Sequence, residues 1–219
     1  MFKKLKKRTN LNMIIGFFGV SVIATYLGLI SGVIGINFAL MGNTSYALVC
    51  LMISGFMDGI DGKIARACKR SDEEKSFGIQ LDSLADMVSF VFLPVVIFYG
   101  MGLSNWYHIV VYAMYIMGGV TRLAYFNVIA ETVRDTKGIV EVYSGLPVPV
   151  SSVVFPLFYL LHYLLVRPTF LAVYVYTMAF VAFLFVLNFK IKKPKSTYVY
   201  IFLAFAILMS GVLFYLGSR

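Results

Sequence analysis

Long apolar stretches, separated by short polar segments, run along the whole 219-residue chain. Each stretch is close to the roughly 20 residues that an α-helix needs to cross a bilayer. The stretches are continuously apolar and do not alternate between apolar and polar residues, which disfavours a β-barrel. The pattern therefore predicts an all-α fold, a polytopic transmembrane helical bundle. The expected spans are residues 20–41, 45–62, 79–103, 107–129, 147–166, 169–189 and 198–217.

The composition supports a membrane protein. Hydrophobic residues make up 60% of the chain and charged residues 13%, whereas about a quarter of the residues of soluble domains are charged. The basic start "MFKKLKKR" is expected to be a retained tail, because the apolar region after it is longer than that of a signal peptide and no cleavage site is evident. Residues 12–19 are a candidate for a short interfacial helix. Cys50 and Cys68 are isolated, which indicates neither a disulfide framework nor a zinc site.

The charges fall on one side of the predicted topology. All Lys and Arg residues except Arg167 and Arg219 lie in the N-terminal tail or in the alternate loops that share its side, and so do all ten acidic residues. The positive-inside rule places this side in the cytoplasm, and the odd number of spans places the C-terminus outside. The net charge of +9 then suits anionic lipid headgroups, and we expect no nucleic-acid partner. The sequence predicts a multi-pass protein of the cell membrane.

Four aspartates lie at the ends of the second and third spans. Asp58 and Asp61 are three residues apart, and Asp82 and Asp86 are four apart, so each pair lies on one face of a helix. Because a short loop joins the two helices, we expect the pairs to face one another. Converging carboxylates repel each other unless cations bind between them, and ligation by carboxylates alone is typical of Mg²⁺ or Mn²⁺. The pattern predicts two such ions, an arrangement that grips a phosphoryl group.

Two glycines and an arginine accompany the acidic pairs. Gly62 and Gly78 would let a nucleotide approach the backbone, and Arg66 would be a bidentate donor to a phosphate. A simpler alternative is that the aspartates are solvated or paired with nearby Lys and Arg residues. That alternative is less favoured for two facing pairs that each have a glycine beside them.

Over residues 58–86 the chain resembles the CDP-alcohol phosphotransferase family. The family motif is D-x2-D-G-x2-A-R, a variable spacer, then G-x3-D-x3-D. The spacer has 11 residues here, where eight is common, and we expect the extra residues of "CKRSDEEKS" to lengthen a surface loop without changing the site. The matching positions are Asp58, Asp61, Gly62, Ala65, Arg66, Gly78, Asp82 and Asp86.

The resemblance implies transfer of a phosphatidyl group from a CDP-linked lipid to an alcohol, with release of CMP. Carried over by position, the four aspartates would hold two divalent cations on the diphosphate, and Asp86 would also be the general base for the attacking hydroxyl. The CDP pocket would be formed by Gly62, Ala65, Arg66 and Gly78.

The resemblance also implies an architecture. It predicts a core of six helices and a homodimer. We expect a basic tail with the interfacial helix at residues 1–19, the membrane domain at 20–195 and one additional C-terminal helix at 196–219.

Three further blocks, "DSLADMVSF", "RLAYFN" and "GLPVP", resemble those of the family branch that uses serine as the acceptor alcohol. The substrates would then be CDP-diacylglycerol and serine. Arg122, at the cytoplasmic end of the fourth span, is a candidate for binding the serine carboxylate, and Asn127 is a candidate for a hydrogen bond nearby. The alternative for Arg122 is an ordinary basic anchor at the membrane boundary.

Two rival functions stay open. A phosphorylated acceptor, glycerol 3-phosphate or inositol phosphate, would keep the same chemistry and need several cations around a second anion. A divalent-cation transporter would place the acids near the bilayer midplane, between broken helices. His108 and His162 lie toward the outer ends of spans, so we do not expect them to be ligands.

Overall fold

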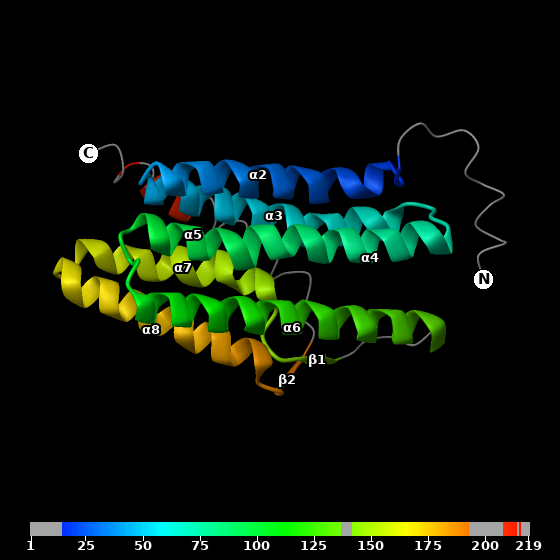
Figure 1. Ribbon diagram of the computed structural model, residues 1–219. Helices are drawn as coiled ribbons and strands as arrows, with labels where there is room; N and C mark the ends of the chain where they lie inside the picture. The colour runs from blue at the N-terminus through cyan, green and yellow to red at the C-terminus, as the bar shows by residue number, and fades with distance from the viewer. Residues whose placement is uncertain (1–14, 137–141, 193–207, 214, 216–219) are drawn as a thin grey trace.

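The helices lie side by side along one direction, and the chain reverses at both ends of the bundle (Figure 1). This computed structural model describes residues 15–136, 142–192, 208–213 and 215. Its elements are the 3₁₀ turn η1 (Val20–Val22), α2 (Ile23–Leu40), α3 (Thr44–Ala67), α4 (Asp72–Asp86), the π-helical segment η2 (Met87–Phe92), α5 (Leu93–Gly100), α6 (Trp106–Thr136), β1 (Val142–Ser144), η3 (Val148–Val150), α7 (Ser151–Tyr159), η4 (Leu160–Tyr163), α8 (Arg167–Val186) and β2 (Lys190–Lys192).

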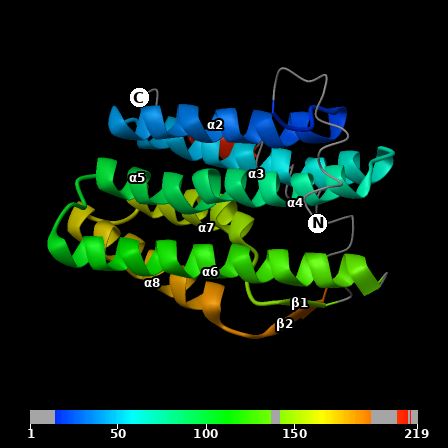
Figure 2. The same cartoon turned by 45° about the vertical axis from the view of Figure 1, so that its right-hand side comes forward.

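Four helices among the described residues are long and apolar enough to cross a membrane. They coincide with four predicted spans, which confirms a multi-pass helical membrane protein. Two further helical segments, α3 and the stretch from η3 to η4, run alongside them in both views (Figures 1 and 2). The helices that meet this length and composition are Ile23–Leu40, Asp72–Gly100, Trp106–Ala130 and Arg167–Val186.

The last predicted span, residues 198–217, lies mainly outside the described residues. Residues 208–213 are helical, and they bury Met209 and Leu213 against the core.

The third helix begins earlier than predicted, at Asp72. Ser71 accepts the backbone N–H of Glu74 at 3.2 Å, and the Glu74 carboxylate accepts the backbone N–H of Ser71 at 2.7 Å. This reciprocal pair is a capping box, which satisfies free donors at a helix start. Our expectation of a longer surface loop is therefore wrong, because only residues 68–71 join α3 to α4 and the rest of the spacer is helical.

Three other local predictions differ from the structure. The fifth span is shorter than predicted, because the continuous helical stretch of η3, α7 and η4 covers Val148–Tyr163 where residues 147–166 were expected. Residues 15–19 are not helical, so the interfacial helix predicted at 12–19 does not form over its described part. The antiparallel pairing of β1 with β2, with Tyr143 opposite Ile191, was not predicted.

Small residues form the buried face of α2, while large apolar side chains such as Leu27 and Ile30 are exposed. This distribution suits a membrane, because lipid solvates the large side chains and small residues let helix backbones approach closely. The hydroxyl of Ser54 on α3 donates a 2.8 Å hydrogen bond to the Gly28 carbonyl on α2. The buried residues of α2 are Ala24, Thr25, Gly28, Ser31, Gly32, Gly35 and Ala39.

The π-helical segment η2 follows Asp86 directly and is packed from two sides. A Cβ atom on Gly32 of α2 would lie 2.6 Å from Ser89 Oγ. From α6, the Tyr115 hydroxyl donates a 2.8 Å hydrogen bond to the carbonyl of Phe90. Short π segments are frequent at functional sites. Here the segment holds the end of α4, and so the second acidic pair, against α2 and α6.

Gly35→Ala is expected to destabilise the bundle, because its Cβ would lie 2.9 Å from both Cys50 Cβ on α3 and Leu93 Cδ2 on α5. Overpacking of this kind costs about 1–3 kcal/mol, which thermal unfolding in detergent would record as a lower Tm. Gly59→Ala is the control, since no atom lies within 4 Å of its Cβ position. Equal Tm values for the two variants would contradict the close packing of α2.

Candidate functional site

The four aspartates come from two helices that are neighbours in the bundle (Figure 1). Asp58 and Asp61 lie in the C-terminal half of α3, and Asp82 and Asp86 lie toward the end of α4. One carboxylate oxygen from each of Asp58, Asp82 and Asp86 lies within 4.8 Å of the other two. The structure therefore brings the two pairs together, as their spacing predicts.

Asp61 is held by a neighbour that the sequence did not single out. Its Oδ2 accepts a 3.1 Å hydrogen bond from the Thr25 hydroxyl on α2, and only 7% of its surface is exposed. Asp86 is 9% exposed. Within the described residues none of the four aspartates forms a salt bridge with Lys or Arg.

Two adjoining cavities surround these carboxylates. All four aspartates line a cavity of about 10 Å³, close to the volume of a single water-sized sphere. A larger cavity of about 300 Å³ contains the other four motif residues, Gly62, Ala65, Arg66 and Gly78. Thr25, Asp61 and Asp82 line both cavities, so the motif forms one continuous site with a narrow acidic part and a wider basic part.

The acidic part suits a hard divalent cation. Mg²⁺ binds oxygen at about 2.0–2.1 Å, so two ligands on opposite sides of one ion are about 4 Å apart. The three clustered oxygens, within 4.8 Å of one another, are near this separation. The donors are carboxylates, the ligand type that Mg²⁺ and Mn²⁺ favour. The residues present therefore fit such an ion.

The two motif glycines make room for guanidinium groups. A Cβ on Gly62 would lie 3.3 Å from Nη1 of Arg66, and a Cβ on Gly78 would lie 3.2 Å from Nη1 of Arg70. Arg66 was expected here, whereas Arg70 was assigned to a surface loop. The sequence contained no motif for Thr25, which lies inside an apolar span, and the capping box at Ser71 was the signal that could have placed Arg70.

The two candidate acceptor residues make contacts within the protein. Arg122 donates from Nε to the Leu146 carbonyl at 3.1 Å and from Nη2 to the Gly145 carbonyl at 3.3 Å. Its guanidinium therefore supports the backbone of the "GLP" segment, where Gly145 has a positive φ of 76°.

Asn127 links α6 to α4. The Ser83 hydroxyl donates to Asn127 Oδ1 at 2.6 Å, and Asn127 Nδ2 donates to Gln80 Oε1 at 3.3 Å. Since Ser83 follows Asp82, Asn127 steadies the helix that carries the second acidic pair. Neither Arg122 nor Asn127 is among the residues that line the two site cavities.

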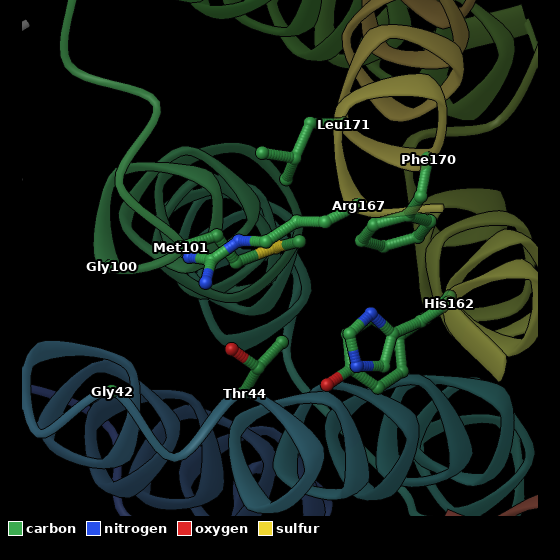
Figure 3. Close-up of a pocket in the computed structure, with 9 residues that line it drawn as sticks. Gly42, Thr44, Gly100, Met101, His162, Arg167, Phe170 and Leu171 are labelled. Atoms are coloured by element: carbon green, nitrogen blue, oxygen red, sulfur yellow. The ribbon is translucent and has the colours of Figure 1, made fainter. Parts of the chain in front are cut away.

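A further pocket lies at the opposite end of the bundle and contains His162 and Arg167 (Figure 3). Thr44 also lines it, and Thr44 begins α3 fourteen residues before Asp58. At 1.5 Å per residue, this separation is roughly 20 Å along the helix. His162 is therefore remote from the acidic cluster, as expected.

Together the fold and the site define a multi-pass membrane protein with a cluster of carboxylates beside a cavity lined by arginines. The model of the CDP-alcohol phosphatidyltransferase family matches residues 18–216. The chain belongs to this family, which confirms the resemblance that rested on the aspartate motif.

Relatives with similar sequences have related names. The chain is 30% identical over 148 residues to an archaetidylserine synthase of Methanothermobacter thermautotrophicus, covering 67% of this chain and 60% of that protein. It is 31% identical over 156 residues to a CDP-diacylglycerol–serine O-phosphatidyltransferase of Saccharomyces cerevisiae, covering 69% of this chain and 52% of that protein. It is 32% identical over 130 residues to the enzyme of that name from Mycobacterium tuberculosis, covering 59% of this chain and 44% of that protein. The chain thus spans about half the length of these relatives.

Thr25→Val is expected to weaken metal binding, because it removes the hydrogen bond to Asp61 while keeping the side-chain volume. Loss of such a contact behind a ligand costs about tenfold or more in metal affinity, which titration of Mn²⁺ into the purified protein would measure. Ser31→Ala is the matched control on the same helix, since its hydroxyl donates to the Cys50 carbonyl and not to a motif aspartate. Equal Mn²⁺ affinities for the two variants would argue against a role for Thr25.

Proposed function

We propose that this protein transfers the phosphatidyl group from CDP-diacylglycerol to the hydroxyl of serine, releases CMP and forms phosphatidylserine. The observation that carries the proposal is the continuity of the acidic cluster with the arginine-lined cavity, through Asp61 and Asp82. The names of the serine-using relatives support serine as the acceptor.

In this proposal Asp58, Asp61, Asp82 and Asp86 hold two Mg²⁺ or Mn²⁺ ions. Such ions, when bound, neutralise the charge of a diphosphate and of its leaving oxygen. The narrow cavity has room for about one ion, and the second position would be toward the wider cavity, which Asp61 and Asp82 also line.

The wider cavity would receive the CDP group. Gly62, Ala65 and Gly78 present little side-chain bulk there, and Arg66 offers the planar donors that match phosphate oxygens. Phosphatidyl transfer then needs an acceptor hydroxyl and a group that takes its proton.

Asp86 is the base in this scheme. The serine hydroxyl gives its proton to a carboxylate oxygen of Asp86, and its oxygen forms a bond to the phosphorus of the phosphatidyl group. The bond from that phosphorus to the CMP oxygen breaks, and CMP leaves with the electron pair. A base near the acceptor contributes directly to such a displacement.

The acceptor would meet Arg122 and Asn127 in different ways. Arg122 uses Nε and Nη2 on backbone carbonyls, so a serine carboxylate would meet its remaining donors. Asn127 is bonded to α4 side chains and would act on serine through the position of that helix.

The location and assembly are also part of the proposal. The basic bias of the loops supports an active site on the cytoplasmic side of the cell membrane. We further propose a homodimer, with the residues after 195 forming an additional C-terminal helix.

Purified protein supplied with CDP-diacylglycerol and Mn²⁺ or Mg²⁺ is expected to release CMP only when serine is added, and to stop when the metal is chelated. The same assay with glycerol 3-phosphate or inositol phosphate is the comparison. Release with a phosphorylated alcohol but not with serine would overturn the acceptor and keep the metal site.

Asp86→Asn is expected to lower turnover by roughly 10³-fold or more, because the amide cannot take the proton and is a poorer metal ligand. Binding of the CDP-linked lipid should largely persist, since the other three aspartates and Arg66 remain. Steady-state CMP release and lipid binding would separate the two effects. Asp72→Asn, an exposed residue paired with Lys75, serves as the control, and full activity in Asp86→Asn would refute the assignment of the base.

A further inference from the structure

Arg70 lies in the four-residue link between α3 and α4, and its side chain extends into the wider cavity of the site. It lines that cavity together with Arg66, Gly78 and Asp82. Nη1 of Arg70 lies close over Gly78, as Nη1 of Arg66 lies close over Gly62. Each of the two motif glycines therefore has a guanidinium above it, and both guanidiniums belong to one cavity.

The Arg70 guanidinium lacks a partner within the described part of the protein. Its Nε is buried and has no hydrogen bond. The three acids closest in sequence are engaged elsewhere: Asp72 pairs with Lys75 at 3.0 Å, the Glu74 carboxylate accepts the N–H of Ser71 at 2.7 Å, and Glu73 has an interaction of its own. A buried donor left without an acceptor is costly, so a ligand acceptor at this position would remove the cost.

The capping box explains how Arg70 comes to lie there. Because α4 begins at Asp72, Gly78 lies nearly two helical turns inside the helix. Arg70 lies two residues before this start, and its side chain extends along the first turns of α4 to bring Nη1 over Gly78. The position of Arg70 depends on this early helix start, and no aspartate or glycine of the motif specifies it.

We infer that Arg70 is a second guanidinium ligand of the substrate diphosphate, acting beside Arg66. The inference rests on the proposed function, because it requires a CDP-linked substrate in this cavity. A diphosphate presents two adjacent anionic groups, and two planar guanidiniums in one cavity can each bond one of them. Lys75, the other cation of this cavity outside the motif, is paired with Asp72 and is less suited to this role.

The rival assignment is that Arg70 binds the carboxylate of serine. The two assignments differ in the substrate whose binding is affected. A diphosphate ligand would change the affinity for CDP and the KM for CDP-diacylglycerol. A carboxylate ligand would change the KM for serine and leave CDP binding unaltered.

The experiment compares Arg70→Ala, Arg70→Gln and Arg70→Lys with the wild-type protein in detergent with Mn²⁺. Calorimetry would measure CDP and CMP binding, and CMP release would give KM for each substrate. Arg70→Ala is expected to weaken CDP binding and raise the KM for CDP-diacylglycerol about tenfold or more. The loss should be smaller for CMP, which has one phosphate, while kcat and the KM for serine stay within about twofold.

Two further variants make the test specific. Arg70→Lys should restore only part of the CDP affinity, because an ammonium lacks the planar pair of donors. Lys69→Ala, next in the chain, exposed and equally charged, is the control for general electrostatic attraction and should bind CDP like the wild type. If Arg70→Ala does not fold, Arg70→Gln keeps length and polarity and answers the same question.

CDP affinity within twofold of the wild type in the Arg70 variants would overturn the inference, as would a change confined to the KM for serine. Failure of the proposed function gives a different result. In that case wild-type protein would not release CMP with serine, while the calorimetric comparison with CDP would still decide the role of Arg70.

Discussion

Mutual repulsion of closely spaced carboxylates is the constraint on which this structure depends. Three aspartate oxygens lie within 4.8 Å of one another, and two of the motif aspartates are nearly buried. Charges at such distances in a partly desolvated site interact by several kcal/mol, so two separate helices must be held together against the repulsion. Bound cations would supply the opposing charge, and the helix packing supplies the geometry.

That packing comes from small residues. The glycines of α2 let its backbone lie against α3 and against the π-helical segment after Asp86, and Ser54 adds a hydrogen bond across the first of these contacts. On the other side, Tyr115 of α6 binds the carbonyl of Phe90. The membrane provides little hydrophobic driving force between helices, so close backbone approach and polar contacts of this kind determine how they pair. The acidic pairs are thus positioned by residues that carry no charge.

The parts of the fold and site that were predictable depend on local periodicity. Apolar stretch length located the spans, and helical spacing placed each aspartate pair on one face, so the convergence of the pairs was correctly anticipated. The features that the sequence did not predict depend on contacts between residues far apart in the chain or on helix caps. Thr25 reaches Asp61 across 36 positions, and the π segment follows from packing against α2 and α6. Arg70 lies in the site because the capping box at Ser71 starts α4 within a stretch that the sequence predicted to be a loop.

The position of the site along the bundle follows from the same helices. In both views the α3–α4 hairpin and the C-terminal part of α6 extend beyond the adjacent ends of α7 and α8 (Figures 1 and 2). The apolar segments η2 and α5 follow the aspartates along the chain, whereas the charged start of α4 precedes Asp82 and Asp86. A substrate that joins lipid tails to a charged nucleotide needs such a boundary, because the tails require lipid and the diphosphate requires cations. Since one hairpin carries the motif aspartates, Arg66 and Arg70, a change in the length of its link would alter the cation site and the cavity together.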